Sequence, residues 1–319
     1  MVCLNFLKYQ MIDPKEISFV FQGPVIEERT SNALQSVRNI FPDSKIILST
    51  WNDMITDNLD FDILKKNEDP GPGPSYRSDK NAPNNVNRQI ISTKHGLTEV
   101  KTKYVVKLRT DIFFTNSNLL HLLTKIEKKI NDNFFKSKII VLSDLSMNPQ
   151  KKRTLYLAAS DWIYCGLSND IKKLFDIKLF PQEEMEWFKK NKSSNIKTID
   201  HFLPRFCAEQ YILLAYLRER KYQIDPIDAF DKEKLNKIHS SVLVNNFIMK
   251  NYKNLGINCF KHPLSFYFNH SMYYSEKEFL NIDKIIIFDI DRLMYEMISL
   301  LKFLIPKNFY YFIKNAIKK

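Results

Sequence analysis

The sequence predicts an α/β fold, with a mixed, mostly parallel sheet flanked by helices and a helical C-terminal extension. The apolar run Ile17–Phe21 stops at Gln22-Gly23-Pro24, as expected for a buried strand that ends in a tight turn. Apolar residues at helical spacing then predict a helix over Thr30–Ile40, with Thr30 or Ser31 as N-cap, and Lys45–Trp51 predicts a second strand. Strand, helix and strand joined by short connections form a βαβ unit, which implies parallel strands and a right-handed crossover.

Later segments extend this pattern. The proline- and glycine-rich segment Asn67–Pro74 cannot be regular structure, and it opens a long loop that runs to Pro83. We expect the following further elements in chain order: a helix over Asn84–Gly96 that Gly96 terminates, a strand over Tyr104–Leu108, a helix over Leu119–Ile130, a strand over Lys138–Leu142, a strand over Asp161–Gly166, a helix from Ser168 or Asn169, and a helix over Cys207–Leu217.

Composition limits the classes of protein that fit. At 319 residues with 44% hydrophobic residues, the chain can bury a full core, and the net charge of +12 favours anionic partners. The four cysteines are far apart and form no CxxC pair, so reduced thiols are expected rather than a zinc site or a disulfide framework. No HExxH pattern occurs; His262 or His270 is the position where a single metal-binding histidine could lie.

The two ends of the chain bear on its location. The first twelve residues hold too short an apolar stretch for a signal peptide, and no run of about 18 uncharged apolar residues predicts a spanning helix. We therefore expect a cytoplasmic protein with a catalytic domain over residues 1–282. Residues 283–319 alternate apolar clusters with lysines, which favours an amphipathic segment on the anionic inner face of the cytoplasmic membrane over a helix pair packed in the core.

The strand over Tyr104–Leu108 ends in a cluster of charges that suits a phosphate or a metal–phosphate pair. Lys107 and Arg109 would bind oxygens and Asp111 would bind a cation, because ligands bind at the carboxyl ends of strands in open α/β sheets. The alternative is a solvated strand end whose charges pair with one another.

Other polar groups could join such a site. Gln22, Gly23 and Pro24 follow the first strand, where glycine permits close backbone approach and glutamine can bind a base or a ribose hydroxyl, although a simple turn is the competing interpretation. Asn87, Arg88 and Gln89 begin a helix whose N-terminus favours anions, although an arginine there can equally face solvent. Asp161 and Glu209 are candidates for a general base, and Glu209 could instead form a salt bridge. No GxGxxG or Walker A pattern is present.

An ordered set of short blocks resembles the WavE lipopolysaccharide synthesis family. The match is dense over the first third of the chain and weaker at Asp161–Tyr164 and Ala208–Gln210. The dense blocks are Phe21–Pro24, Ser36–Pro42, Leu48–Trp51, Asn67–Gly71, Asn84–Gln89 and Tyr104–Asp111.

The resemblance implies a bacterial glycosyltransferase of lipopolysaccharide or capsule synthesis with a GT-A-like (Rossmann-like) fold. Gln22, Gly23 and Pro24 would line the nucleotide site, and Trp51 and Asp69 would lie beside the base and ribose. Asp111 would be the metal-binding acid for Mn²⁺ or Mg²⁺. A D-x-D pair would need an aspartate at position 109 or 113, where this chain has Arg109 and Phe113. Metal-independent catalysis, with Arg109 and Lys107 neutralising the diphosphate, is therefore also open.

The expected reaction moves a sugar from a nucleotide-sugar donor to a hydroxyl of a glycan or lipid-linked acceptor. Asp161 or Glu209 would be the base if the configuration inverts. Three other functions remain open: a nucleotide-dependent polyol- or sugar-phosphate transferase, a non-catalytic scaffold of the same fold, and a nucleic-acid-binding protein. For the last, the chain has no zinc finger, RNP-type strand or KH loop, so no nucleic-acid partner is expected.

Overall fold

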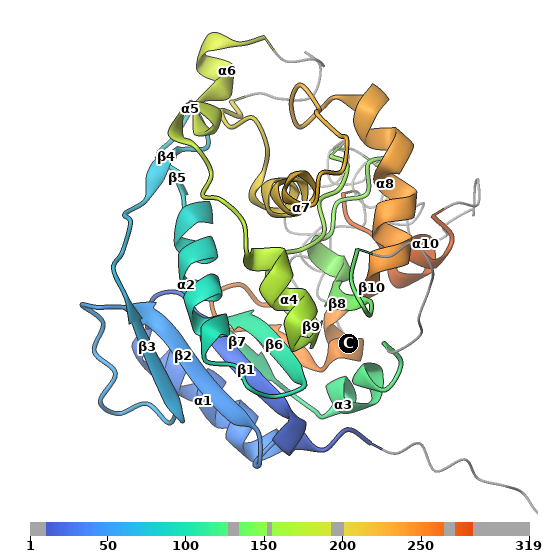
Figure 1. The fold of residues 1–319 in the computed structure, drawn as a ribbon. Coiled ribbons are helices and arrows are strands. Elements are labelled where there is room, and N and C mark those ends of the chain that lie inside the picture. Colours follow the sequence, from blue (N-terminus) through green and yellow to red (C-terminus); the bar gives the residue numbers. More distant parts are fainter. Residues whose placement is uncertain (1–10, 127–133, 152–154, 193–200, 265–271, 283–319) are drawn as a thin grey trace, which may run out of the picture.

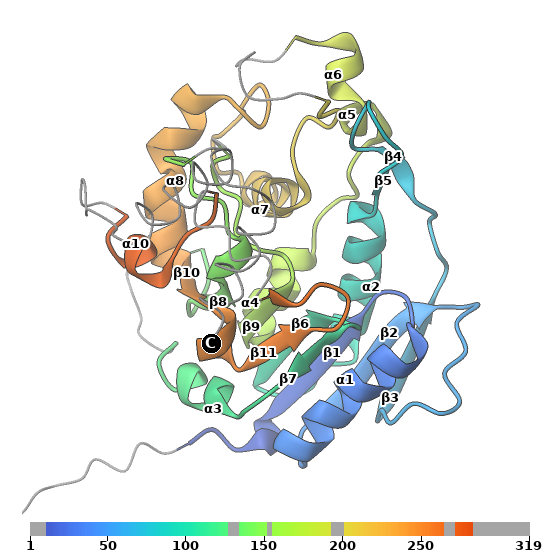
Figure 2. The same cartoon turned by 180° about the vertical axis from the view of Figure 1, so that it is seen from behind.

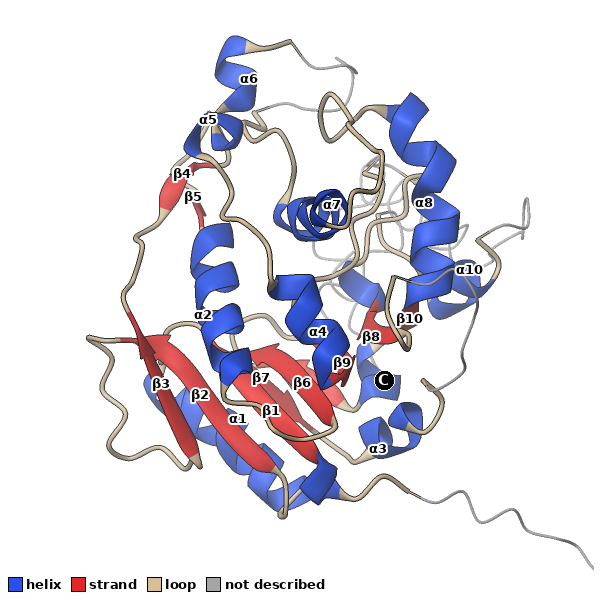
Figure 3. Cartoon of the chain, viewed as in Figure 1, coloured by secondary structure: helices blue, strands red, loops and turns tan. Residues whose placement is uncertain are grey.

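The computed structural model describes residues 11–126, 134–151, 155–192, 201–264 and 272–282. A seven-stranded sheet in the order β10-β8-β9-β6-β1-β2-β3 forms its centre (Figure 1; Figure 3). Its strands are β1 (Ile17–Gln22), β2 (Lys45–Trp51), β3 (Ile63–Asn67), β6 (Tyr104–Arg109), β8 (Ile139–Leu142), β9 (Ile163–Leu167) and β10 (Phe247–Lys250).

The strand directions agree with the predicted fold class. β1 pairs in parallel with β2 and β6, β2 with β3, and β10 with β8, whereas β9 is antiparallel to both of its neighbours. The fold is therefore an α/β, GT-A-like fold with a mixed, mostly parallel sheet, as the sequence predicts. The predicted βαβ unit is confirmed with β2 at its expected bounds.

Helices cover both faces of the sheet. α1 (Glu27–Ile40) packs on one face, and α2 (Val86–Thr98) and α4 (Ser168–Phe175) pack on the other (Figures 1 and 2). Alternate residues of β6 point to opposite sides, so Val105 joins the core cluster with α2 and α4 while Val106 joins the one with α1. α7 (Ala208–Glu219) and α8 (Lys232–Asn246) extend the first cluster.

A small antiparallel sheet lies beside the end of β6. It pairs β7 (Ile112–Phe114) with β11 (Ile257–Cys259), and the amide of Phe260 donates to the carbonyl of Asp111 at 2.9 Å. This pairing brings Lys261 and His262 next to Asp111, although they are far away in the sequence. The remaining described elements are β4 (Gly73–Ser75), β5 (Pro83–Asn84), α3 (Asn118–Leu123), α5 (Gln182–Met185), α6 (Trp187–Lys190), α9 (Tyr252–Leu255), α10 (Glu276–Leu280) and two 3-10 helices, Pro14–Glu16 and Ser143–Leu145.

Gly96 does not terminate α2, contrary to the prediction. The helix continues to Thr98, and Gly96 lies where α2 crosses the sheet. A Cβ atom at this position would be 2.7 Å from Cγ1 of Val20 and 2.8 Å from Cβ of Ser49. The glycine is therefore needed for close packing of the helix on β1 and β2.

Other predicted boundaries also need correction. The segment Asn67–Pro74 is not entirely irregular, contrary to the prediction: Asn67 ends β3, and Gly73 and Pro74 belong to β4, which pairs with β5. α1 begins one turn earlier than expected, with Ile26 as N-cap, and Oγ1 of Thr30 accepts from the amide of Ile26 at 2.8 Å from within the first turn. α3 ends at Leu123, and the rest of the predicted helix falls partly on residues 127–133, outside the described ranges. The predicted segment 283–319 also lies outside them. In the described part of the chain, no helix is long and apolar enough to cross a membrane.

Candidate active site

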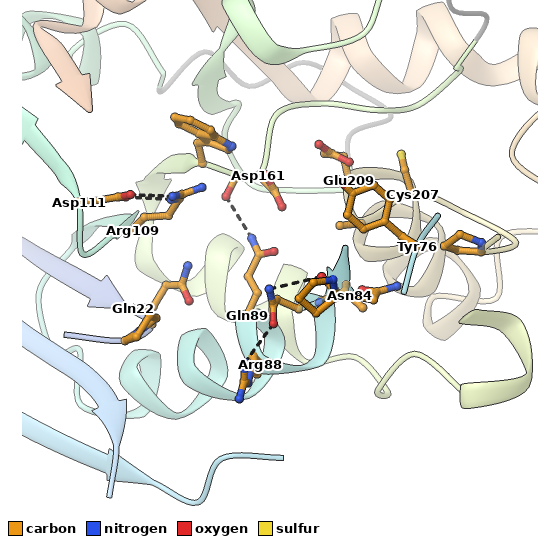
Figure 4. A pocket seen from close by; sticks show the side chains of 18 of the residues that line it. Gln22, Tyr76, Asn84, Arg88, Gln89, Arg109, Asp111, Asp161, Cys207 and Glu209 are labelled. Carbon is orange, nitrogen blue, oxygen red and sulfur yellow. Dashed lines mark hydrogen bonds and ion pairs between the residues drawn. The ribbon is translucent and has the colours of Figure 1, made fainter. Parts of the chain in front are cut away.

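A cavity of about 770 Å³ lies where β1, β2 and β6 end (Figure 4). Of the thirteen site residues predicted from the sequence, eleven line this cavity: Gln22, Gly23, Pro24, Trp51, Asp69, Arg88, Gln89, Arg109, Asp111, Asp161 and Glu209. Their common location follows from the parallel strands, whose carboxyl ends meet at one edge of the sheet.

The turn after β1 forms one wall. Gly23 has a φ of +114°, a conformation that side-chain-bearing residues rarely adopt, and its amide donates to the carbonyl of Ser49 at 3.1 Å. Oε1 of Gln22 accepts from Oγ of Ser92 at 2.8 Å. Oγ of Ser92 also lies 2.7 Å from the carbonyl oxygen of Arg88. The side-chain amide of Gln22 thus lies between α2 and Arg109 at the end of the strand (Figure 4).

Arg109 is a cation of the cavity wall that a carboxylate and an aromatic ring hold in place. Its Nε donates to Oδ1 of Asp111 at 2.9 Å, and its terminal nitrogen donates to Oδ2 at 2.7 Å. The guanidinium also lies 4.4 Å from the ring centroid of Trp162. The Arg109 side chain is 29% exposed and that of Asp111 is 1% exposed. The carboxylate therefore holds the guanidinium from the protein side while part of the guanidinium stays accessible from the cavity.

The residues around Asp111 do not fit a divalent cation held by the protein. Both carboxylate oxygens already accept from Arg109, and Phe113, where a second acid would be needed, stacks on Phe260 with ring centroids 4.2 Å apart. Within the described ranges, no group of three or more His, Cys, Asp or Glu side chains could hold a metal ion. His262 lies near Trp162, with ring centroids 6.1 Å apart, and His270 falls outside the described ranges.

Two carboxylates, Asp161 before β9 and Glu209 in the first turn of α7, line the cavity beyond Arg109. Burial raises the pKa of Glu209, and the negative charge of Asp161 raises it further. Electrostatic repulsion of this kind between neighbouring carboxyls favours a state in which one is protonated. Such a pair can accept a proton from a hydroxyl near neutral pH.

Asp69 and Arg88 form a second ion pair, next to Trp51. Arg88 donates to both carboxylate oxygens, at 2.7 and 2.5 Å, and the amide of Gly71 donates to Oδ1 of Asp69 at 3.0 Å. The hydrogen bonds from Arg88 lower the pKa of Asp69, and partial burial opposes them. The pair ties the proline- and glycine-rich loop to the start of α2. Arg88 is therefore partly neutralised by Asp69.

Asn87 and Lys107 do not lie in the cavity wall, contrary to expectation. The side chain of Asn87 donates to the carbonyl of Phe180 at 3.0 Å and accepts from its amide at 2.7 Å, so it clamps a loop. Lys107 is 0% exposed, and its Nζ donates to the backbone carbonyl of Asp161 at 2.6 Å. Its position in the middle of β6 places it under the site, where it cannot bind a phosphate oxygen directly.

The apolar wall of the cavity was not predicted from the sequence. This wall consists of side chains far apart in the chain: Tyr76, Met147, Leu155, Phe202, Pro204, Phe206 and Phe230. No periodic or local signal connects them, since only the tertiary fold brings these loops together. Trp162 was also missed as a partner of Arg109; its position next to Asp161 was the one available signal.

Comparison with known proteins identifies the family of this chain. The family model described as WavE lipopolysaccharide synthesis matches residues 17–318. No curated protein matches the chain. The matched range covers nearly the whole sequence, including every residue of the cavity wall named above. The chain therefore belongs to the WavE lipopolysaccharide synthesis family.

Proposed function

We propose that this protein is a glycosyltransferase of bacterial surface polysaccharide synthesis, moving a sugar from a nucleotide-activated donor to an acceptor hydroxyl. The observation that carries the proposal is the anchored Arg109 guanidinium in a cavity that also contains the Asp161 and Glu209 carboxylates. A cation suits the charge that develops on a leaving diphosphate, and a carboxylate suits the proton that an acceptor hydroxyl must lose.

In this proposal, the nucleotide-sugar donor binds in the part of the cavity formed by the ends of β1, β2 and β6. The diphosphate lies against Arg109 and the turn at Gln22 and Gly23; Lys261, next to Asp111, is a further cation of the cavity wall. The base and ribose extend toward Trp51 and the Asp69–Arg88 pair. Because Arg109 is held at two points, its charge is in place before the bond to the leaving group breaks and requires little reorganisation.

The acceptor half lies beyond the two carboxylates. Asp161 or Glu209 takes the hydroxyl proton as the hydroxyl oxygen attacks the anomeric carbon, and the donor diphosphate leaves with the bonding electron pair. The apolar wall that includes Phe202, Phe206 and Phe230 suits the apolar face of a sugar ring in a glycan or lipid-linked acceptor. A basic segment over residues 283–319 would hold the protein at an anionic membrane surface where such acceptors are found.

A binding screen followed by a transfer assay tests the proposal. Thermal shifts are measured with UDP, GDP, CMP and ADP, with manganese and with EDTA, and the nucleotide that binds selects the nucleotide sugars to assay. We expect one nucleotide to stabilise the protein, and transfer that EDTA does not abolish. Loss of transfer in EDTA would refute Arg109 as the cation. A phosphodiester in the product would replace the proposal with sugar-phosphate transfer, and binding without turnover of any donor would indicate a scaffold.

A further inference from the structure

Lys107 is a buried cation that the proposed phosphate site does not use. It lies in the middle of β6, with its Nζ 5.5 Å from the ring centroid of Tyr164 and 5.6 Å from that of Phe175. Burial lowers the pKa of Lys107 to about 7; the charge of Asp161 raises it and that of Arg109 lowers it. A methionine of similar length would fill this space without the cost of desolvating an ammonium. Packing alone therefore does not explain why a lysine occupies this position.

The contact that Lys107 makes is with the backbone of the site. Its Nζ donates to the carbonyl of Asp161 at 2.6 Å, and Nε2 of Gln89 donates to the same oxygen at 3.1 Å. One donor comes from the central sheet and the other from α2, so two rigid elements fix a single peptide group just before β9. The Asp161 side chain lies on one side of that group and Trp162, 4.4 Å from the Arg109 guanidinium, lies on the other.

We propose that Lys107 is a positioning residue for the transfer reaction, holding the Asp161 peptide so that the Asp161 carboxylate and the Trp162–Arg109 stack keep their places. This inference rests on the proposed glycosyltransferase function. Lys107 itself touches no substrate, since it is 0% exposed.

The charge of Lys107 acts on the same carboxylate. The titratable groups that face its Nζ are Asp161 from the segment before β9, Arg109 from β6 and Tyr164 from β9; burial raises the pKa of Tyr164 well above its usual value, so its hydroxyl stays neutral. Glu209 from α7 faces Asp161, so the positive charge of Lys107 lies close to a pair of carboxyls. Removing that charge takes away electrostatic stabilisation of the negative pair, and we expect the acid limb of the pH–rate profile to move to higher pH.

The test compares Lys107→Met with Gln89→Leu and with the control Val105→Ala. Lys107→Met removes both the hydrogen bond and the charge, whereas Gln89→Leu removes one hydrogen bond to the same carbonyl and leaves the charge. Val105 is on the same face of β6, buried in the core. We expect Lys107→Met to lower kcat about 100-fold, with little change in donor KM, and to move the acid limb upward by about one pH unit. Gln89→Leu should lower kcat without moving the limb, and Val105→Ala should lower the melting temperature alone.

The outcomes separate this inference from the proposed function. If the wild type transfers sugar and Lys107→Met has the same kcat and the same pH profile, the proposed role of Lys107 is overturned. Absence of transfer by the wild type with every donor would instead refute the proposed function. In that case, the ¹³C chemical shift of the Asp161 backbone carbonyl still tests the inference: we expect it to change in Lys107→Met and not in Val105→Ala, and an unchanged shift in Lys107→Met would overturn it. If Lys107→Met does not fold, unchanged kcat in Gln89→Leu is the refuting result.

Discussion

Replacing Arg109 by methionine tests the central assignment, provided that loss of charge is separated from loss of stability. The variant removes the guanidinium and leaves the Asp111 carboxylate, 1% exposed, without its bidentate partner. Removing one member of a buried ion pair costs about 3–5 kcal/mol. Because Arg109 is 29% exposed and its pair is therefore partly solvated, we expect a cost near the lower end, about 3 kcal/mol.

The double variant Arg109→Met, Asp111→Asn separates the loss of the catalytic charge from the loss of stability. It removes the unpaired charge, so most of the lost stability should return, whereas the cation for the diphosphate stays absent. Loss of one preorganised group that stabilises transition-state charge lowers kcat by about 10²–10³. We therefore expect both variants to transfer sugar at least 100-fold more slowly than wild type.

The measurements are chemical unfolding and steady-state transfer with the nucleotide sugar that the binding screen selects. Far-UV circular dichroism of each variant checks that the fold is kept. If the double variant recovers transfer together with stability, Arg109 has a structural role only. If Arg109→Met is folded and transfers sugar at the wild-type rate, Arg109 is not the cation for the leaving diphosphate.

Two further predictions concern stability. Burial lowers the pKa of His239 to about 3, below its unfolded value, so its contribution to stability is full above pH about 6.5 and is lost as the pH falls; over about two pH units below 6.5, the unfolding free energy of the wild type should fall by about 2 kcal/mol relative to that of His239→Asn, and the same pH dependence in both proteins would contradict this. Gly96→Ala should destabilise the protein by about 1–3 kcal/mol, because the added Cβ would meet Val20 and Ser49 at 2.7 and 2.8 Å. Gly166→Ala is the control, since its Cβ would be 3.6 Å or more from its neighbours, and equal melting temperatures for the two variants would disprove the packing argument.

The elements that the sequence predicted well are those with a complete local signal. β1, α1, β2, α2 and β6 each carry an apolar pattern with recognisable turns, and each was found close to its predicted range. The antiparallel direction of β9 and the place of β10 at the sheet edge depend on long-range pairing, which no local pattern encodes. Local reasoning therefore identified the βαβ core and the mixed character of the sheet, but not the strand order.

The same limit explains the two misplaced site residues. A lysine near a strand end looks like a phosphate ligand, but alternation along β6 puts Lys107 on the same face as Val105, under α2 and α4. Asn87 has the polar side chain expected at a helix start, but its two hydrogen bonds go to Phe180, ninety-three residues away. In both cases the residue type indicated a polar contact, and the direction of the side chain determined that this contact is made inside the protein and not in the cavity.

Under the proposed function, Arg109 supplies the positive charge that a metal held by a second acid would otherwise supply. β6 ends at Arg109, and Thr110 and Asp111 form the turn that follows, which brings the Asp111 carboxylate onto the guanidinium of the last strand residue. The guanidinium occupies both oxygens of Asp111. The cation is thus part of the chain, held by a carboxylate and by the Trp162 ring instead of by two carboxylates. Under the proposed function, a chelator does not remove this cation, and Asp111 partly offsets its charge. Transfer then depends on where the Arg109 guanidinium lies, and the fixed Asp161–Trp162 peptide supports that position through the Trp162 ring.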